Sequence, residues 1–126
     1  MMAREELIDL AQRFVDAFNR NDLDAVMGCF ADGAIYDEFN GRRNVGLEAI
    51  RAAFVPQFTG AYGEMKFIDE DLFVDAETGK VMASWRCTLS IKGRATAWRG
   101  LDLMYFKDGK LIAKSTYAKA AAPLFQ

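Results

Sequence analysis

An acidic residue, Asp102, lies within the apolar stretch WRGLDLMYFKDGK at residues 98–110, a pattern that predicts a strand followed by a tight turn. Alternate residues of a strand share a face, so Asp102 is expected on the same face as Trp98 and Met104. A carboxylate buried among such side chains is energetically costly, so we expect it to be paired, protonated or directed at a cavity. Asp102 is therefore a candidate functional residue.

Two further acids, Asp37 and Glu38, lie in the segment AIYDEFNG at residues 34–41, which predicts a short strand closed by an Asn-Gly turn. Strict alternation places Glu38 on the face of Tyr36 and Asp37 on the opposite face. Alternation therefore separates the two acids onto opposite faces of the strand, although a β-bulge would exchange them.

Both candidate acids, Glu38 and Asp102, also have a purely structural interpretation. The first could form an exposed ion pair at the end of its strand, and the second could accept hydrogen bonds within the core. The available arginines are Arg42 and Arg43 for Glu38, and Arg86 and Arg99 for Asp102.

The composition limits which chemistries are open to this 126-residue chain. It contains no histidine, which excludes Ser-His and Cys-His nucleophile systems and His-ligated metal sites. The two cysteines, Cys29 and Cys87, are far apart in the sequence and are expected to be reduced core thiols of a cytoplasmic protein. There is no Gly-rich phosphate loop, and we expect neither a metal nor another cofactor.

Charge and hydropathy limit the partners. Acidic and basic residues are interspersed, the formal net charge is −2 and there is no basic stripe, so nucleic acid is not expected as a partner. No apolar run approaches the length of a membrane span, so a membrane is not expected as a partner either. The N-terminus begins directly with a charged amphipathic pattern, and we expect no signal peptide there.

The chain is rich in aromatic residues, with 10 Phe, 4 Tyr and 2 Trp, and such side chains fill a core or line an apolar pocket. Plain core packing is the alternative interpretation for each of them. The candidate pocket-lining residues are Phe14, Phe18, Tyr36, Phe54, Trp85, Trp98 and Met104.

Three helices are predicted in the first half of the chain. Apolar residues at helical spacing predict an amphipathic helix over residues 3–20 and a short second helix over 22–30. A third helix is predicted over residues 47–58, and Pro56 should kink or end it. Between the second helix and the first strand, ADG at residues 31–33 predicts a turn.

The sequence after Gly60 has the alternating pattern of β-strands, and Lys114 and Lys119 in the last strand are expected on a solvated face. Short turns join these strands and make sequential neighbours antiparallel. The turns lie at residues 77–80, 92–94 and 107–110. Together, the elements predict one domain over residues 1–126 with an α+β fold, in which three N-terminal helices pack on a curved antiparallel sheet and form a cone with an apolar cavity.

Three stretches of the chain resemble a known family. They are QRFVDAFNRNDLDAVMGCFADGAIYDEFNG at residues 12–41, GLEAIRAAF at 46–54 and KGRATAWRGLDLMYFKDGKL at 92–111. These stretches resemble the ketosteroid-isomerase and SnoaL-like branch of the nuclear-transport-factor-two-like superfamily. The resemblance implies the cone-shaped α+β fold and agrees with a homodimer. The superfamily contains isomerases, cyclases, epoxide hydrolases, dehydratases and non-catalytic binding modules, so the fold alone does not select a function.

The resemblance to the isomerases implies roles for individual residues. Their general-base carboxylate, at the end of the first strand, falls on Glu38, and their neutral aspartic acid, which donates a hydrogen bond to the oxyanion, falls on Asp102. The tyrosine of their first helix falls on Phe14, so that hydroxyl donor is absent here. The tyrosines that could replace it are Tyr36, Tyr62, Tyr105 and Tyr117.

The sequence therefore predicts a cofactor-free isomerase or polyketide-type cyclase that acts on a small apolar carbonyl compound, with Glu38 as base and Asp102 stabilising the enolate. A non-catalytic module that binds a small apolar ligand is the alternative. An epoxide hydrolase is the third interpretation, although it needs an Asp-Arg-Asp set that the sequence does not place. A homodimer is predicted because Leu101, Leu103 and Tyr105 form an apolar face opposite Asp102.

Overall fold

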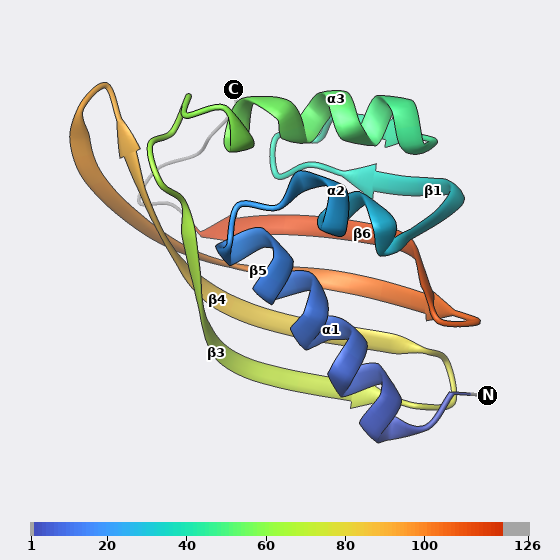
Figure 1. Cartoon of the computed structure of the whole chain (residues 1–126). Helices are drawn as coiled ribbons and strands as arrows, with labels where there is room; N and C mark the ends of the chain where they lie inside the picture. Colours follow the sequence, from blue (N-terminus) through green and yellow to red (C-terminus); the bar gives the residue numbers. More distant parts are fainter. Residues whose placement is uncertain (1, 120–126) are drawn as a thin grey trace.

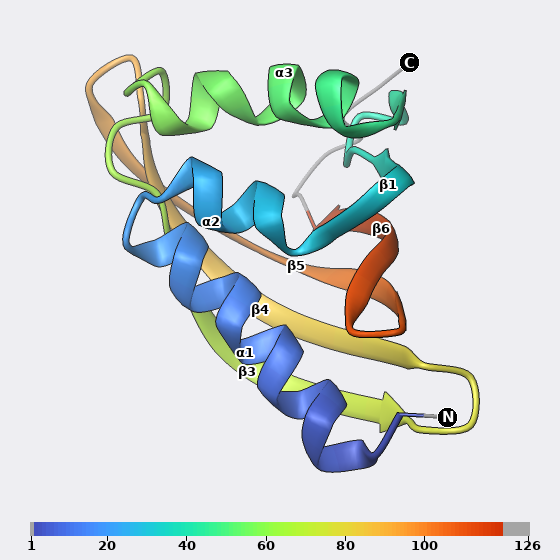
Figure 2. The ribbon, with the colours of Figure 1, turned by 45° about the vertical axis from the view of Figure 1, so that its right-hand side comes forward.

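The computed structural model describes residues 2–119, in which a strongly curved sheet curls around three helices (Figure 1). The helices are α1 (Arg4–Asn19), α2 (Leu23–Gly28) and α3 (Leu47–Phe58). All three lie on the concave side of the sheet, where α1 packs on β3 and β4 and α3 packs on β1 and β2 (Figure 2). This arrangement confirms the predicted α+β cone.

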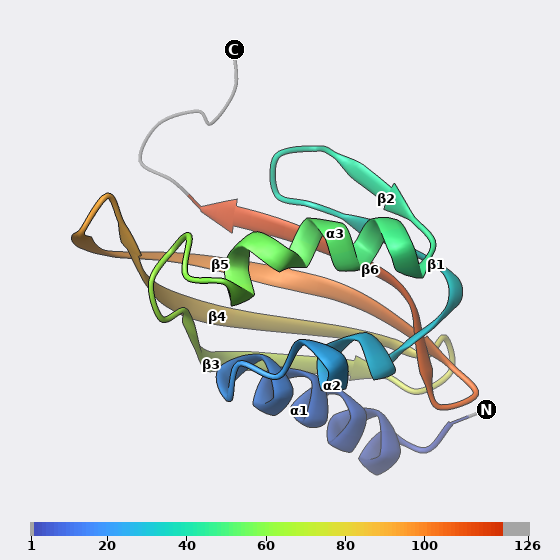
Figure 3. The same cartoon turned by 45° about the horizontal axis from the view of Figure 1, so that its top comes forward.

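The strands are β1 (Phe30–Asp37), β2 (Arg43–Val45), β3 (Lys66–Asp75), β4 (Lys80–Ile91), β5 (Arg94–Lys107) and β6 (Lys110–Lys119). They form a six-stranded sheet in the order β2-β1-β6-β5-β4-β3 (Figure 3). The neighbouring strands β6 and β5, β5 and β4, and β4 and β3 pair antiparallel, as the short turns predict, but β1 pairs with β6 in parallel. The sheet is therefore mixed, because turn length determines only how sequential strands pair.

The helices form where the apolar spacing predicts them. The buried side chains of α1 follow one face of the helix and include Leu7, Phe14 and Phe18. The side chain of Asp22 accepts a hydrogen bond from the Ala25 N–H and so caps the N-terminus of α2. Pro56 does not end α3, which continues to Phe58.

Two local features of the first strands differ from the prediction. Residues 31–33 belong to β1, and Gly33 has a φ of 72° within a register shift between Phe30 and Ile35. Regular pairing resumes at Ile35, so the alternation that places Glu38 is preserved. The three-residue strand β2 was not predicted, because so short a segment has too few residues to show a pattern.

The long strands β4 and β5 alternate as predicted. Val81, Trp85 and Cys87 point from β4 into the cone, and Asp102 and Met104 do so from β5. The hairpin of these strands curls toward the segment after α3, where the Ser90 N–H donates to the Tyr62 carbonyl at 2.8 Å. No helix among the described residues is long and apolar enough to cross a membrane.

Candidate functional site

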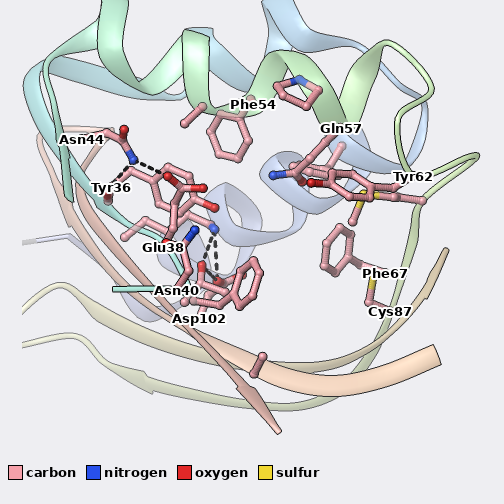
Figure 4. Close-up of a pocket in the computed structure, with 18 of the residues that line it drawn as sticks. Tyr36, Glu38, Asn40, Asn44, Phe54, Gln57, Tyr62, Phe67, Cys87 and Asp102 are labelled. Carbon is pink, nitrogen blue, oxygen red and sulfur yellow. Dashed lines mark hydrogen bonds and ion pairs between the residues drawn. The ribbon is translucent and has the colours of Figure 1, made fainter. Parts of the chain in front are cut away.

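The concave side of the sheet and the helices enclose a cavity of about 560 Å³ (Figure 4). Six of the seven predicted pocket residues line it, namely Phe14, Phe18, Tyr36, Phe54, Trp85 and Trp98. Met104 does not line the cavity and is 1% exposed in the core with Val81 and Phe106. The prediction for Met104 was wrong because the inward face of β5 leaves the cavity beyond Asp102 and enters the closed, packed end of the cone.

Aromatic side chains make up much of the cavity wall. Phe54 stacks on Tyr36 with the ring centroids 4.8 Å apart and the planes 12° apart. At the other end of the cavity, the ring of Phe67 meets Trp85 edge to face at 4.9 Å. Polar groups, including Glu38 and Asp102, gather at the Tyr36 end (Figure 4). The cavity thus suits a ligand with an apolar body and a polar group at one end.

Glu38 lies directly after β1, and its side chain lines the cavity. Asn44 of β2 donates from Nδ2 to Glu38 Oε2 at 3.0 Å, and the Glu38 N–H donates to the Arg42 carbonyl at 2.9 Å. The short strand β2 therefore orients the carboxylate. Glu38 is half-buried, and its hydrogen-bond donor is a neutral amide.

Asp37 points away from the cavity, as strict alternation predicts. Arg43 holds it with two hydrogen bonds, Nε to Oδ1 at 2.8 Å and Nη2 to Oδ2 at 2.9 Å. These hydrogen bonds lower the pKa of Asp37 below its ordinary value. Arg43 is thus the ion-pair partner of Asp37 rather than of Glu38, and of the two acids only Glu38 lines the cavity.

Asp102 is 8% exposed, and three side chains surround its carboxylate. Trp85 Nε1 donates to Oδ2 at 3.1 Å, Thr116 Oγ1 donates to Oδ1 at 2.6 Å, and Lys114 Nζ lies 3.1 Å from Oδ1. Neither arginine considered as a partner pairs with Asp102: the ion pair is with Lys114, and Arg99, which alternation places on the opposite face, pairs with Glu70. The carboxylate is an ion-paired acceptor, which differs from the neutral donor that the resemblance implied.

Lys114 is 5% exposed, so the prediction of a solvated lysine was wrong. The cause is a bulge in β6: Tyr105 pairs with Ala113 and Phe106 with Leu111, which leaves Ile112 as an extra residue. Beyond the bulge the alternation is reversed. Lys114 and Thr116 therefore point into the cone, with Thr116 directly opposite Asp102 and Lys114 opposite Met104.

The Lys114 ammonium lies in a polar and aromatic environment. Its Nζ donates to Thr116 Oγ1 at 2.7 Å and lies 4.4 Å from the centroid of the Tyr36 ring, with Phe54 at 5.7 Å. Burial by itself would lower the pKa of Lys114, but the negative charge of Asp102 and the neighbouring Tyr36 and Glu38 raise it above its ordinary 10.5. Lys114 is therefore an ammonium ion at neutral pH.

The comparison with family models identifies the family of the chain. Residues 11–114 match the model of the SnoaL-like domain. The chain belongs to the SnoaL-like domain family. Among curated proteins, no relative matches this SnoaL-like chain.

Solved structures share the fold of this SnoaL-like protein. A protein from Xanthomonas campestris pv. campestris, proposed to be a polyketide cyclase, is 22% identical, with 92% of each chain covered and a TM-score of 0.82. One of the same description from Pseudomonas putida KT2440 is 18% identical, with 90% of this chain and 91% of that chain covered and a TM-score of 0.80. An NTF2-like protein of unknown function from Mesorhizobium loti is 22% identical, with 95% and 97% covered and a TM-score of 0.78. At these identities the similarity confirms the α+β fold.

Of the four tyrosines that could replace the missing hydroxyl donor, Tyr36 and Tyr62 line the cavity, whereas Tyr105 and Tyr117 do not. Burial raises the pKa of Tyr36, which the charge of Lys114 partly opposes, so its hydroxyl stays protonated at neutral pH. Among the described residues, no group of three His, Cys, Asp or Glu side chains is placed to hold a metal ion.

Proposed function

We propose that this SnoaL-like protein is a cofactor-free enzyme that removes a proton next to the carbonyl group of a small, largely apolar compound. The main supporting observation is the position of Glu38, whose carboxylate lines an aromatic cavity and is held by a neutral amide. Asn44 occupies Oε2, and within residues 2–119 no hydrogen-bond partner engages Oε1. That oxygen can accept the proton.

Proton removal turns the substrate into an enolate, and two outcomes follow from it. In an isomerisation, the protonated Glu38 returns the proton to a different carbon. In an intramolecular aldol cyclisation, the enolate carbon attacks a second carbonyl group of the same molecule, and the new alkoxide takes up the proton. The similarity in fold to proteins proposed to be polyketide cyclases supports the second outcome beside the first.

The cavity supports a substrate of modest size with an apolar body. Its volume lies within the range of about 300–1,000 Å³ that is usual for small-molecule sites. Phe18, Phe54 and Trp98 would contact the apolar body, and the polar group would lie at the end with Glu38 and Asp102. Binding in this orientation brings the acidic C–H bond toward Glu38.

A non-catalytic module that binds an apolar ligand is the second candidate. The observation that favours it is Asp102, whose carboxylate is fully engaged by Trp85, Thr116 and Lys114 and so has a sufficient structural role. The two functions differ in what they require of Glu38. A binding module tolerates its neutralisation, whereas the enzyme does not.

The convex face of the sheet supports a homodimer, which is also part of this proposal. Phe73, Met82 and Leu103 are register partners across β3, β4 and β5, and they form an apolar row opposite the cavity. Phe73 is 66% exposed and Leu103 is 38% exposed. A second copy of the chain would remove this row from water.

Deuterium exchange tests the proposed reaction without knowledge of the natural substrate. A panel of small ketones, β,γ-unsaturated ketones and 1,5-diketones is incubated with the protein in D₂O, and loss of the α-proton signals is followed by NMR. For at least one class of ketone, we expect the α-protons to exchange faster with the protein than in buffer alone. Glu38→Gln should lower that rate by about 10²–10⁴-fold, the usual contribution of a general base.

Asp37→Asn is the matched control, since it changes the neighbouring acid, which pairs with Arg43 outside the cavity. It should leave the exchange rate within about twofold of the parent. A Glu38→Gln protein that exchanges as fast as the parent would reject Glu38 as the base. Tight ligand binding with no exchange by any variant would favour the binding module.

A further inference from the structure

The ion pair of Lys114 and Asp102 lies in the wall of the cavity rather than in the packed core. Removing two charges from water is costly, and an apolar pair of similar size is often at least as stable. Stability alone therefore does not require a charged pair at this position. Its position at the more polar end of a largely apolar cavity points to a ligand.

The ammonium has one donor to spare. Lys114 Nζ carries three N–H groups; it donates to Thr116 Oγ1 at 2.7 Å and lies 3.1 Å from Asp102 Oδ1 in an ion pair, and these two contacts occupy at most two of them. Figure 4 marks these contacts by dashed lines. No acceptor among the described residues engages the third N–H, and Lys114 lines the cavity.

Of the two cations that line the cavity among the described residues, Lys114 is buried and Arg42 is exposed, and the neutral Tyr36 hydroxyl has no charge to balance a negative oxygen. The Asp102 carboxylate repels it, and the Trp85 N–H is already donated to that carboxylate. The charged groups facing Lys114 are Asp102 from β5 and Glu38 from the end of β1. When Glu38 has taken a proton from the substrate, its charge is gone, and the new anion is the substrate oxygen.

We propose that the Lys114 ammonium binds the oxyanion of the enolate, and that Asp102 is the positioning residue that holds this ammonium in place. This inference rests on the proposed proton abstraction. It names the ligand class of the site as planar, apolar compounds with an enolate or phenolate oxygen. Thr116 and Trp85 fix the Asp102 carboxylate, and the aromatic ring of Tyr36 covers the ammonium.

The step balances without a redox partner. Glu38 Oε1 takes the proton, the C–H electron pair forms the enolate double bond, and the carbonyl π electrons move to oxygen. The oxygen then accepts a hydrogen bond from Lys114, which keeps its proton. A charge-assisted hydrogen bond of this kind is stronger in the enolate than in the neutral ketone, as transition-state stabilisation requires.

A coloured phenol tests the oxyanion site directly. Glu38→Gln mimics the protonated base, and 4-nitrophenol, whose ionised form absorbs in the visible range, mimics the enolate. At a pH below the pKa of the free probe, we expect the probe bound to the Glu38→Gln protein to be ionised, with a phenolate-to-phenol ratio about tenfold or more above that in solution.

Removing the ammonium should abolish this enrichment. In the Glu38→Gln background, Lys114→Met combined with Asp102→Leu replaces the ion pair with apolar side chains, so no charge is left unpaired. This variant should bind the probe as the neutral phenol. Lys119→Met in the same background is the matched control, because it removes an exposed lysine of the same strand, and it should leave the bound spectrum unchanged.

Asp102→Asn in that background tests the positioning role. The amide keeps the shape of the side chain but removes the charge that holds Lys114. If Asp102 acts mainly by positioning the ammonium, this loss outweighs the relief of repulsion between the carboxylate and the oxyanion, and the phenolate enrichment should fall while the apolar contacts remain. Should the Lys114→Met/Asp102→Leu form not fold, ¹⁵N NMR of the lysine Nζ groups in the Glu38→Gln protein gives the same answer. One lysine resonance should then shift when the probe is added.

Three results overturn the inference: no binding of the probe to the Glu38→Gln protein, binding as the neutral phenol, or phenolate binding that does not need Lys114. These results are distinguishable from failure of the proposed reaction, since probe binding requires no turnover. Phenolate binding through Lys114 without any deuterium exchange would reject the enzyme and keep the site. Deuterium exchange that requires Glu38 but not Lys114 would reject this inference and keep the proposed reaction.

Discussion

The ion pair of Lys114 and Asp102 should show strong coupling when its two members are replaced separately and together. Lys114→Met keeps most of the apolar stem but leaves the carboxylate of Asp102 without its cation, at 8% exposure. Loss of one partner of a buried pair costs about 3–5 kcal/mol. Because Trp85 and Thr116 still donate to Asp102, we expect the lower end, about 3 kcal/mol.

Replacing both members should recover most of this loss. Lys114→Met/Asp102→Leu removes the unpaired charge, although Trp85 Nε1 and Thr116 Oγ1 each lose an acceptor at a cost of about 1 kcal/mol. The added apolar contacts of Leu and Met offset part of that cost. We therefore expect the double variant to lie within about 1–2 kcal/mol of the parent and above the single variant.

Urea unfolding at pH 7, followed by tryptophan fluorescence and circular dichroism, measures these free energies. The m values should agree among the variants, so that differences in midpoint report stability. A Lys114→Met protein as stable as the parent would refute the reasoning, as would a double variant less stable than the single one. Either result would mean that the buried charge of Asp102 does not depend on Lys114.

Three further predictions concern pH, packing and assembly. The pKa of Lys114 is raised above 10.5 in the folded state, so its contribution to stability should be complete below that pH and should be lost as the pH rises through the folded-state pKa. The urea midpoint of the parent should therefore fall more steeply at alkaline pH than that of Lys114→Met/Asp102→Leu, and equal slopes would contradict this. Gly100→Ala should lower the free energy of unfolding in urea by about 1–3 kcal/mol, because the added Cβ would lie 2.5 Å from the Trp85 side chain. Gly28→Ala is the control, since its Cβ would have no atom within 4 Å, and equal urea midpoints for the two variants would contradict the prediction. Phe73→Glu should convert a dimer to a monomer by light scattering at micromolar concentration, and a monomeric parent would reject the dimer.

Alternation predicted the inward face of β5 because that strand is regular over its length. The prediction that Asp102 must be paired, protonated or face a cavity followed from the same pattern, and the acid is in fact paired and lines the cavity. Its partner was not predictable by alternation. The bulge at Ile112 reverses the faces of β6, and no residue near it marks an extra position, so Lys114 was assigned to the wrong face.

The pairing of β1 with β6 could not be predicted from the turns, because the two strands are separated by most of the chain. That pairing places Tyr36 beside Lys114 in register and so completes the polar end of the cavity. The position of Glu38 was predictable, since the irregularity in β1 precedes the alternating segment. One signal could have identified the cluster: a strand carries a lysine and a threonine two residues apart, and the neighbouring strand carries an acid that points into the cone.

The most direct test of the account is a crystal structure of the Glu38→Gln protein with 2-naphthol bound. We predict that the fused rings lie inside the cavity against Phe54 and Trp98, with the naphthol oxygen at hydrogen-bond distance from Lys114 Nζ and a ring carbon facing the glutamine amide that replaces the base. A naphthol bound outside the cavity, or bound inside it with its oxygen directed away from Lys114, would contradict the account.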